Sequence, residues 1–477
     1  MSGDPTPRGI TLWTRVDDVG GRGGVRLEVA RDRAFRRMVA RKEILTSDSL
    51  DHTVKARVGG LDPHERYYYR FETRSGESRV GRFQTALPAD SRETVRFGVF
   101  SCQEYTFGYF NAHRAMARED LDFVVNLGDY IYSDVAFSPP QGVRSGDFQM
   151  SEGRFSAFTR DEYRQVYRVV HSDPDLQDVH ARFSVISTWD DHEVQNDYSG
   201  GDPQGGAVTG DPYDAARRNR AYGVFFEQMP TYPVRDRRGR FRLYHTARFG
   251  RTVDLFVLDE RQYRDRDPCG NAVGPACEEV GGPDDFLGET QLSYARGGIT
   301  RSRAAWKVIA NEVPIMPVKR NETDYEGWDI WQGFPVEREA LLRTIRGVPD
   351  VVFVTGDWHA FISGDVQTAD GRSVASEFVG GSVTSPGESE INALINRPGF
   401  GTLDDPQFPP DELARRKAAN PWFDDFDPVH HGYFTCRASR SEFQTTFKKL
   451  TTIRRRTTEL AERRTWTIRR GQRGLGR

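Results

Sequence analysis

Lysine is almost missing from this chain of 477 residues, which uses arginine for nearly all of its positive charge. Seven lysines leave 60 of the 67 basic residues as arginine, and the formal net charge is −3. A charge this close to zero provides no global field that would select nucleic acid or acidic substrates. The arginine-rich segments 454–456 and 463–470 are the local exception, and we interpret them as a solvated face. The composition therefore predicts no specific nucleic-acid binding.

Long apolar runs are absent too. No stretch approaches the ~20 consecutive apolar residues that a membrane-spanning helix requires. Met1 is followed directly by Ser-Gly-Asp-Pro-Thr-Pro, so this sequence contains no signal peptide pattern. The 37% of hydrophobic residues is still enough to build a large core. We therefore expect a folded monomer without a transmembrane segment.

Cysteine is scarce as well, with four residues in the whole chain. Cys269 and Cys277 flank a short turn-rich loop, and a disulfide between them would suit an oxidising compartment. Two free surface thiols are the alternative. Cys436 lies in a strand-like run and is predicted to be simply buried. Cys102 differs because it ends an apolar strand, which makes it a candidate for a chemical role.

The first 88 residues have the pattern of a small all-β domain. Four segments alternate polar and apolar residues, and Gly, Asp and Pro turns separate them at the spacing of a β-sandwich. These segments are 9–15, 24–30, 52–58 and 66–72. The turn before Tyr67 fits a tyrosine-corner-like anchor. The pattern predicts an immunoglobulin- or fibronectin-like module at residues 1–88.

From residue 92 onward, strands alternate with helical patterns, which is typical of an α/β domain. The predicted helices are 110–118, 161–170, 215–228, 302–305 and 336–346, and the predicted strands include 252–258, 306–313, 351–355 and 377–379. Glycine-, aspartate- and proline-rich stretches at 136–153, 199–214, 264–290 and 385–411 predict long loops, which on a compact domain often carry function. We predict one catalytic domain over residues 92–477.

Four apolar strands of this region run directly into polar side chains. The side chains concerned are Cys102, Asp129, Tyr132, Asp190, Asp191, His192, Asp357 and His359. In an open α/β sheet, residues just past the carboxyl ends of the strands line the ligand crevice. Asp357 and His359, two apart on an extended segment, would point to the same side. We therefore expect these groups to share one metal centre.

Each of these residues also has an ordinary explanation when taken alone. Asp129 could be a helix N-cap, His192 a structural hydrogen-bonding histidine, and Cys102 a buried thiol. The combination favours a metal, because adjacent buried aspartates repel each other unless a cation neutralises them. Thiolate prefers softer ions such as Fe or Zn, whereas carboxylates prefer Ca, Mg or Mn. A site with both donor types indicates a mixed-metal centre.

Two further residues have candidate catalytic roles. His192, beside a metal-bound substrate, could protonate a leaving oxygen. Arg261 follows another apolar strand, and its planar guanidinium could grip phosphate oxygens. The alternative for Arg261 is a salt bridge within the surrounding Asp/Arg cluster.

Taken together, the motifs resemble those of the alkaline phosphatase D family, a branch of the calcineurin-like metallophosphoesterases that includes iron-dependent phospholipase D-like enzymes. They occur in the family's order over nearly the whole chain. The motifs are Gly60-Leu-Asp-Pro-His-Glu-Arg-Tyr-Tyr-Tyr-Arg-Phe71, Ser101-Cys-Gln103, Leu127-Gly-Asp-Tyr-Ile-Tyr132, Trp189-Asp-Asp-His-Glu193, Leu258-Asp-Glu-Arg-Gln-Tyr-Arg-Asp265 and Gly356-Asp-Trp-His359.

The resemblance implies a four-layer α/β/β/α metallophosphoesterase sandwich that hydrolyses phosphate esters with a metal-activated water. It implies Fe³⁺ held by Cys102, Asp129, Tyr132 and His359. It also implies Ca²⁺ that shares Asp129 and uses carboxylates such as Asp191 and Asp357. Of the adjacent Asp190 and Asp191, position in the motif favours Asp191. His192 occupies the place of the proton-donating histidine, and the family's export implies a secreted or periplasmic location.

Three alternatives remain open. Phospholipase D chemistry would use the same metals, and Phe137, Phe148, Phe400 and Phe408 in the long loops could touch lipid or pack against the body of the protein. A binding protein with an inert α/β domain is the second. The third is an amidohydrolase barrel, which needs a His-x-His strand end that this sequence lacks.

Overall fold

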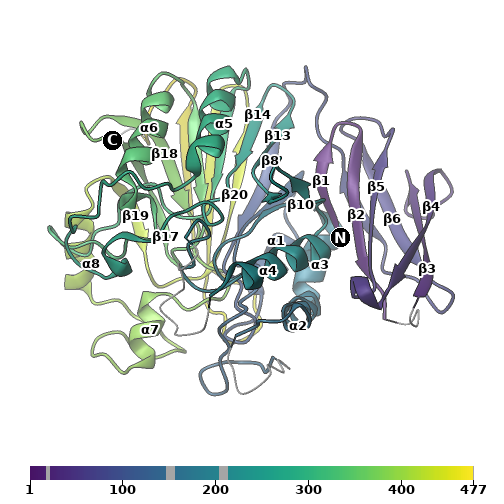
Figure 1. The fold of residues 1–477 in the computed structure, drawn as a ribbon, viewed down its shortest axis with the longest axis horizontal. Coiled ribbons are helices and arrows are strands. Elements are labelled where there is room, and N and C mark those ends of the chain that lie inside the picture. The colour runs from purple at the N-terminus through teal and green to yellow at the C-terminus, as the bar shows by residue number, and fades with distance from the viewer. Residues whose placement is uncertain (18–21, 147–155, 203–212, 476–477) are drawn as a thin grey trace.

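Two large β-sheets and one small sheet form the framework of the computed structural model, which describes residues 1–477 except 18–21, 147–155, 203–212 and 476–477 (Figure 1). The nine-stranded sheet has the order β22 (Leu460–Arg469), β21 (Glu442–Leu450), β20 (Gly432–Ala438), β8 (Val95–Phe100), β9 (Phe123–Leu127), β10 (Ser184–Thr188), β1 (Ser2–Thr6), β2 (Gly9–Arg15) and β5 (Thr53–Gly59). The seven-stranded sheet has the order β13 (His245–Phe249), β14 (Val253–Val257), β15 (Trp306–Asn311), β16 (Val351–Thr355), β18 (Ser373–Val379), β17 (Phe361–Gln367) and β19 (Phe423–Asp427). The small sheet is four-stranded, in the order β4 (Met38–Ser47), β3 (Arg22–Ala30), β6 (Arg66–Glu72) and β7 (Gly81–Gln84), and β11 (Val234–Arg235) pairs with β12 (Phe241–Arg242).

The helices are α1 (Asn111–Met116), α2 (Arg160–His171), α3 (Pro174–Arg182), α4 (Ala215–Gln228), α5 (Gly288–Arg301), α6 (Pro335–Arg346), α7 (Glu388–Leu394) and α8 (Pro410–Ala419), with short 3₁₀ turns η1 (Asp48–Leu50), η3 (Pro268–Asn271) and η4 (Trp331–Gly333). Local sequence explains several of their ends. Thr159 and Glu162 form a capping box at the start of α2, and Asp173 caps α3 ahead of Pro174 at its first turn.

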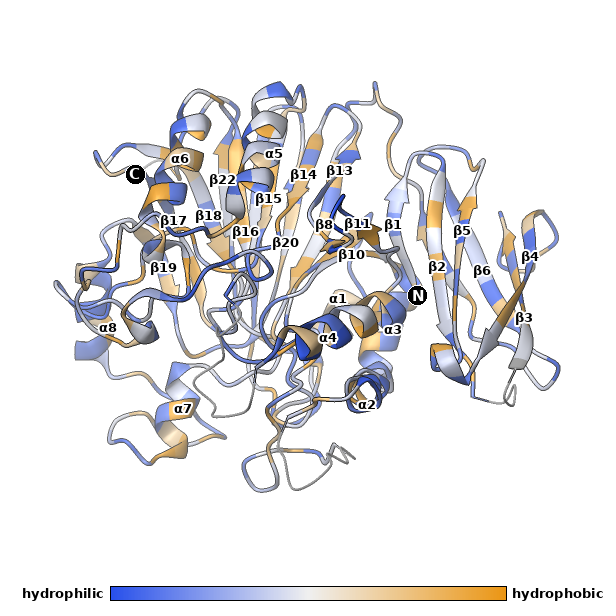
Figure 2. Cartoon of the chain, viewed as in Figure 1, coloured by the Kyte–Doolittle hydropathy of each residue, from blue (hydrophilic) through white to orange (hydrophobic). Residues whose placement is uncertain are grey.

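One hydrophobic core lies between the two large sheets. Its members come from β8 and β9 on one side and from β14, β15 and β16 on the other. Strands β9, β10, β14 and β16 are buried along their whole length, as expected for parallel strands covered on both faces. Figure 2 shows the apolar residues concentrated on these central strands.

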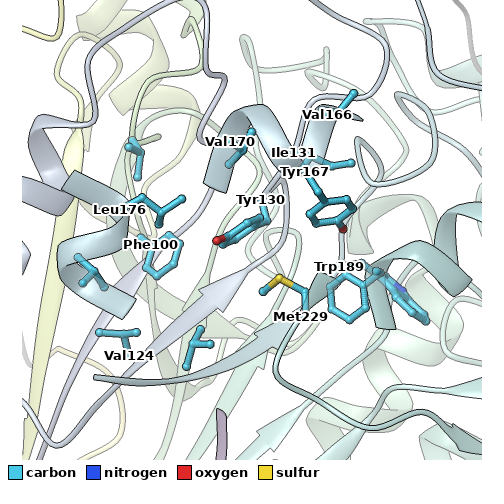
Figure 3. Close-up of a cluster of buried hydrophobic side chains, with 14 of the residues drawn as sticks. Phe100, Val124, Tyr130, Ile131, Val166, Tyr167, Val170, Leu176, Trp189 and Met229 are labelled. Atoms are coloured by element: carbon cyan, nitrogen blue, oxygen red, sulfur yellow. The ribbon is translucent and has the colours of Figure 1, made fainter. Parts of the chain in front are cut away.

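Two further cores lie between the large sheets and the helices. Residues of α1 to α4 pack on the outer face of β8, β9 and β10, and residues of α5 and α6 pack on the seven-stranded sheet. Figure 3 shows part of the first of these cores, to which Val170, Leu176, Phe100 and Val124 belong, with Leu176 beside Phe100. The prediction of a mixed α/β fold with several sheets is confirmed.

The N-terminal strands are divided between the small sheet and the nine-stranded sheet. β1 pairs in parallel with β10, Ser2 opposite Ser184, so β1, β2 and β5 continue the nine-stranded sheet. The small sheet packs against β2 and β5 through a separate core. The backbone N–H of Asp62 donates to the hydroxyl of Tyr67 at 2.9 Å, which is the kind of contact expected of a tyrosine corner. The β-rich start of the chain is therefore joined edge to edge with the α/β region.

Some predicted elements were wrong. Residues 302–305 are not a helix; α5 ends at Arg301, and Ser302 turns into extended backbone with its hydroxyl donating to Asp254. The predicted loop 385–411 contains α7 and the start of α8, and α3 was missed. Parts of the predicted loops 136–153 and 199–214, Phe148 among them, lie outside the described residues.

The disulfide between Cys269 and Cys277 is formed, with Cα atoms 5.8 Å apart, and Cys102 and Cys436 are free and buried. In the part of the chain that the structure describes, no helix is both long enough and apolar enough to cross a bilayer.

Phe123 connects the two large sheets, and its loss should weaken the whole fold. The ring is 1% exposed and stacks on Phe97 (centroids 5.2 Å apart) and on Phe249 of β13 (4.1 Å). Phe123→Ala should lower the free energy of unfolding by about 3–5 kcal/mol, because it leaves a cavity between the sheets. Urea denaturation followed by tryptophan fluorescence measures this change. Leu45→Ala, at a side chain that is 70% exposed, is the control and should cost less than about 0.5 kcal/mol. Equal costs for the two variants would contradict the role of this stack.

Candidate metal centre

The predicted metal-binding residues meet where strands of the two large sheets end. β8, β9 and β10 are parallel neighbours, so the segments that follow them leave the sheet at one edge. The segment after β16 reaches the same place from the seven-stranded sheet, because Arg261 contacts both Asp190 and Asp357. All nine predicted site residues lie in one connected cluster: Cys102, Asp129, Tyr132, Asp190, Asp191, His192, Arg261, Asp357 and His359.

One end of the cluster carries sulfur, phenol, carboxylate and imidazole. The possible ligand atoms of Cys102, Asp129 and His359 all lie within 4.8 Å of one another. The hydroxyl of Tyr132 donates to Oδ2 of Asp129 at 2.8 Å and lies 3.0 Å from Nε2 of His359. These four donors can therefore face one cation, and we call them the thiol end of the cluster.

The other end consists of carboxylates. Asp190, Asp191 and Asp357 form a second group within the same 4.8 Å limit, and Asp129, Asp191 and His192 form a third. Asp129 belongs to the thiol end and to the third group. Asp191 belongs to the second and third groups, so the three groups overlap. We call Asp190, Asp191 and Asp357 the carboxylate end.

Two buried oxygens of the carboxylate end fit a cation. Among the described residues, Oδ2 of Asp190 and Oδ1 of Asp191 have no hydrogen-bond partner, although both side chains are almost fully buried. A buried carboxylate oxygen without a hydrogen bond carries a desolvation cost, which for Oδ1 of Asp191 is offset only in part by Nη2 of Arg261 at 3.5 Å. A bound cation removes that cost, so the donor set of this structure fits a metal.

Backbone strain occurs at four of the candidate ligands, as it does at ten other non-glycine residues among those described. Cys102, Asp129, Asp357 and His359 have φ angles of 58°, 52°, 65° and 51°, in the left-handed region that non-glycine residues seldom adopt. The sequence-based picture of Asp357 and His359 on an extended segment was therefore wrong, and they point to different groups of the cluster. Each such residue costs on the order of 1–3 kcal/mol, and this kind of strain gathers at functional sites.

Gly128 allows the sharp turn that presents Asp129. Its φ is 98°, and a Cβ at this position would collide with Cβ of Asp190. No other residue type has both the conformational freedom and the small size that this position requires. The Gly-Asp sequence after β9 is thus explained by local sterics.

Glu193 ties two of the loops together, a role that sequence reasoning missed. Its carboxylate accepts backbone N–H bonds from Asp129 (3.0 Å), Tyr130 (2.8 Å) and Asp190 (2.8 Å). The only sequence signal was its place at the end of the Asp-Asp-His-Glu motif. Glu193 therefore fixes the spacing between the β9 and β10 loops.

His359 is held in its neutral form. Its Nδ1 lies 3.0 Å from the carbonyl oxygen of Pro386, so this nitrogen carries the proton and Nε2 faces the thiol end with a free lone pair. Burial lowers the pKa of His359 to about 4, which keeps the ring uncharged at neutral pH.

His192 is oriented by Asp134, a second residue that the sequence did not reveal. Its Nδ1 lies 2.6 Å from Oδ1 of the buried Asp134, and its ring stacks on Tyr132 at a centroid distance of 4.0 Å. Burial alone lowers the pKa of His192, but the carboxylates of Asp134, Asp191 and Asp129 outweigh it and leave the pKa well above its usual range. Nδ1 is thus occupied, and Nε2 is the nitrogen left for a reaction.

Arg261 is fully buried and pairs with the carboxylate end. Its Nε donates to Asp190, and its Nη2 lies 3.0 Å from Asp357 and 3.5 Å from Asp191. Asp329, which the sequence did not single out, lies 3.5 Å from Nη1. Burial raises the pKa of Asp191, but Arg261 and His192 outweigh burial and hold this carboxyl below its usual pKa. Arg261 therefore acts as an internal counter-charge in this structure.

The thiol and the phenol of the site are uncharged unless a cation binds. Burial and the Asp129 carboxylate raise the pKa of Cys102 and of Tyr132 well above their ordinary values. Metal binding to such ligands releases protons and is favoured by higher pH.

Comparisons with known proteins agree with this geometry. The family described as PhoD-like phosphatase matches residues 97–447, and the N-terminal domain of PhoD-like phosphatases matches residues 1–87. The chain therefore belongs to the PhoD-like phosphatase family, and it is a phosphoric ester hydrolase.

Individual relatives cover almost the whole chain. Alkaline phosphatase D of Bacillus subtilis (strain 168) is 29% identical over an alignment of 494 positions, which covers 99% of this chain and 81% of the relative. The solved structure of PhoD is 28% identical with a TM-score of 0.86, over 98% of this chain and 89% of that one. Purple acid phosphatase PPD1 from yellow lupin is 11% identical with a TM-score of 0.57, over 97% of this chain and 73% of that one, a likeness of fold alone. The predicted family and enzyme class are confirmed.

Cys102 should be required for metal retention, whereas the other buried thiol should not. Cys102→Ala removes the sulfur of the thiol end, so the purified variant should lose its bound transition metal and its activity together. Cys436→Ala is the matched control, because Cys436 is equally buried in β20 but lies outside the candidate metal groups. Elemental analysis of both variants gives the result. Full metal content in Cys102→Ala would contradict the proposed ligand set.

Proposed function

We propose that this protein hydrolyses phosphate esters with a water activated by metals held between the thiol end and the carboxylate end. The observation that carries the proposal is the convergence of sulfur, phenol, imidazole and carboxylate donors, with buried carboxylate oxygens that have no hydrogen-bond partner among the described residues. Packing alone gives no reason to gather these groups.

The donor chemistry supports one softer and one harder cation. Fe³⁺ would be held by the four donors of the thiol end, and Ca²⁺ by Asp129, Asp191 and Asp357. Arg261 contacts both Asp190 and Asp191, and Asp191 is preferred because it belongs to two of the ligand groups whereas Asp190 belongs to one. When bound, such cations polarise phosphoryl oxygens and lower the pKa of a coordinated water.

The chain's own residues then have distinct tasks. His192, with Nδ1 held by Asp134, would protonate the leaving oxygen through Nε2. Arg261 offsets the charge of the carboxylate end, and a direct contact with substrate phosphate would require it to leave part of that cluster. Arg261 would therefore act as a counter-charge in the free protein and would clamp phosphate only after such a movement.

Phospholipid substrates are the second candidate, supported by an exposed apolar pair beside the site. Ile391 on α7 is 50% exposed and Ile395, directly after this helix, is 71% exposed, and the carbonyl oxygen of the preceding Pro386 contacts His359. Phe400 and Phe408, the other possible lipid contacts in this loop, are buried. Phosphomonoesters and phosphodiesters remain the first proposal.

Finer features of the architecture and location belong to the same proposal. The helix-sheet-sheet-helix order around the central core supports a four-layer α/β/β/α catalytic domain at residues 92–477, preceded by an immunoglobulin- or fibronectin-like domain at residues 1–88. The Cys269–Cys277 disulfide supports a secreted or periplasmic location.

The substrate class can be tested by three assays run side by side. We expect turnover of p-nitrophenyl phosphate or bis-p-nitrophenyl phosphate, with bound metal detected in the same sample by elemental analysis. Turnover of phosphatidylcholine alone would favour the phospholipid candidate. A protein that contains no metal and hydrolyses none of the three would overturn the proposal.

The role of His192 can be tested through the leaving group. p-Nitrophenolate departs without protonation, whereas an alkoxide requires a proton. His192→Ala should therefore reduce kcat for an alkyl phosphate by about 100-fold or more, in line with the 10²–10⁴ contribution of general acids. For p-nitrophenyl phosphate the loss should be at least tenfold smaller. Equal losses on both substrates would argue against proton donation by His192.

A further inference from the structure

The disulfide-closed loop at residues 269–277 lies beside the metal centre and contains a strained asparagine. Cys269, Gly270 and Asn271 follow one another in the left-handed region, with φ angles of 57°, 61° and 54°. The disulfide to Cys277 and the bond from the Cys269 N–H to Glu279 (2.7 Å) hold this backbone in place. A strained backbone conformation persists only where surrounding contacts hold it in place, and such strain is typical of functional segments.

The strained turn aims the side chain of Asn271 between two segments of the site. Its Oδ1 accepts the backbone N–H groups of Trp328 (2.6 Å) and Asp329 (3.1 Å). Its Nδ2 donates to Oδ2 of Asp197 at 3.2 Å. Gly327 is needed for this approach, since a Cβ there would lie 2.9 Å from Oδ1 of Asn271.

Both segments lead directly to the carboxylate end. The N–H of Asp197 donates to Oδ2 of Asp191 at 2.6 Å, and so directs the other oxygen of Asp191 into the cluster. Asp329 is the fourth carboxylate around Arg261, at 3.5 Å from Nη1. The side chain of Asn271 thus contacts Asp197, which supports the candidate ligand Asp191, and the backbone of Asp329, which lies beside the counter-charge Arg261.

A neutral amide suits this position better than a charged group would. Asp197 and Asp329 are both acidic. Nδ2 of Asn271 donates to the side chain of Asp197, and Oδ1 of Asn271 accepts the backbone N–H of Asp329. A carboxylate at position 271 would keep the acceptor for the backbone N–H groups but would have no N–H donor for Oδ2 of Asp197.

We propose that Asn271, held by the Cys269–Cys277 disulfide, is a positioning residue that sets Asp191 and Arg261 for metal retention and phosphate-ester hydrolysis. This inference rests on the proposed function, because it assigns to Asn271 the support of that same site. Partners of metal ligands of this kind contribute about 10–100-fold to metal affinity or activity.

The test uses Asn271→Asp in the full-length protein, because the change preserves shape and the two accepted N–H bonds. The matched control is Asn321→Asp. Asn321 has the same pattern, with Oδ1 accepting from Thr323 and Asp324 and Nδ2 donating to Asp324, but its turn has no contact with Asp191 or Arg261 among the described residues. Purified proteins are dialysed against graded EGTA, and the metal that remains bound is measured by elemental analysis.

We expect Asn271→Asp to lose half of its chelator-sensitive metal at an EGTA concentration about tenfold lower than wild type, and Asn321→Asp to match wild type. In the absence of EGTA, kcat should fall about tenfold while KM changes less than twofold. The Cys269→Ser/Cys277→Ser variant should change in the same direction. Serine variants are used in place of chemical reduction because thiol reductants themselves bind transition metals.

A double variant that exchanges the side chains at positions 271 and 197 distinguishes a positioning role from a general loss of structure. Asn271→Asp combined with Asp197→Asn restores one donor and one carboxylate, so it should recover most of the metal retention. A swap that stays at the single variant's value, or equal behaviour of the two aspartate variants at positions 271 and 321, would overturn the proposal. Wild-type protein without metal or hydrolytic activity would instead refute the proposed function, so the two failures are distinguishable.

Discussion

The structure depends on the neutralisation of buried carboxylates that crowd around one point. Asp190, Asp191 and Asp357 lie within contact distance of one another, and all are buried or nearly so. Two unit charges 4 Å apart repel by about 4 kcal/mol at an effective dielectric constant of 20. Three such pairs would cost about as much as the whole 5–15 kcal/mol stability of a typical domain. The fully buried Arg261 offsets part of this cost, and cations are the natural source of the rest.

The same constraint explains the strained loops. Cys102, Asp129, Asp357 and His359 follow three different strands, and they can face one cluster because the backbone turns sharply through the left-handed region after each of these strands. Fully buried parallel strands and the stacked rings between the sheets supply the rigidity that holds these turns. Glu193 then locks two of the loops by accepting three backbone N–H groups.

Short-range patterns in the sequence were sufficient to predict the candidate ligands. Apolar strands that end in Asp, His or Cys identified all nine residues of the cluster, because parallel strands bring their ends to one edge. Local pattern also predicted the burial of Cys436 and the bridge between Cys269 and Cys277. The continuous sheet through β1 and β10 could not be predicted, because it depends on a pairing between Ser2 and Ser184, far apart in sequence.

Side-chain partners at long sequence distance escaped prediction for the same reason. Asp329 reaches Arg261, and Asp134 reaches His192 across 58 positions, and neither stands in a recognisable motif.

The helix α5 was missed because its sequence contains three glycines and its start follows a glycine-rich stretch, which weakens the helical pattern. Tertiary packing of Ala295 and Ile299 against the seven-stranded sheet supplies the stabilisation that propensity does not.

The two ends of the centre are therefore supported by different means. Cys102 and Asp129 stand directly after adjacent strands of the nine-stranded sheet, so their positions are set by the most buried part of the fold. Asp191 and Arg261 depend in addition on loop residues, Asp197 and Asp329, which meet at Asn271 on the disulfide-closed turn. Local unfolding that leaves the core intact will affect the carboxylate end first, because opening a loop costs less free energy than opening a central strand. The oxidised turn beside the site adds a restraint to the end of the centre that depends on loop contacts as well as on the sheet.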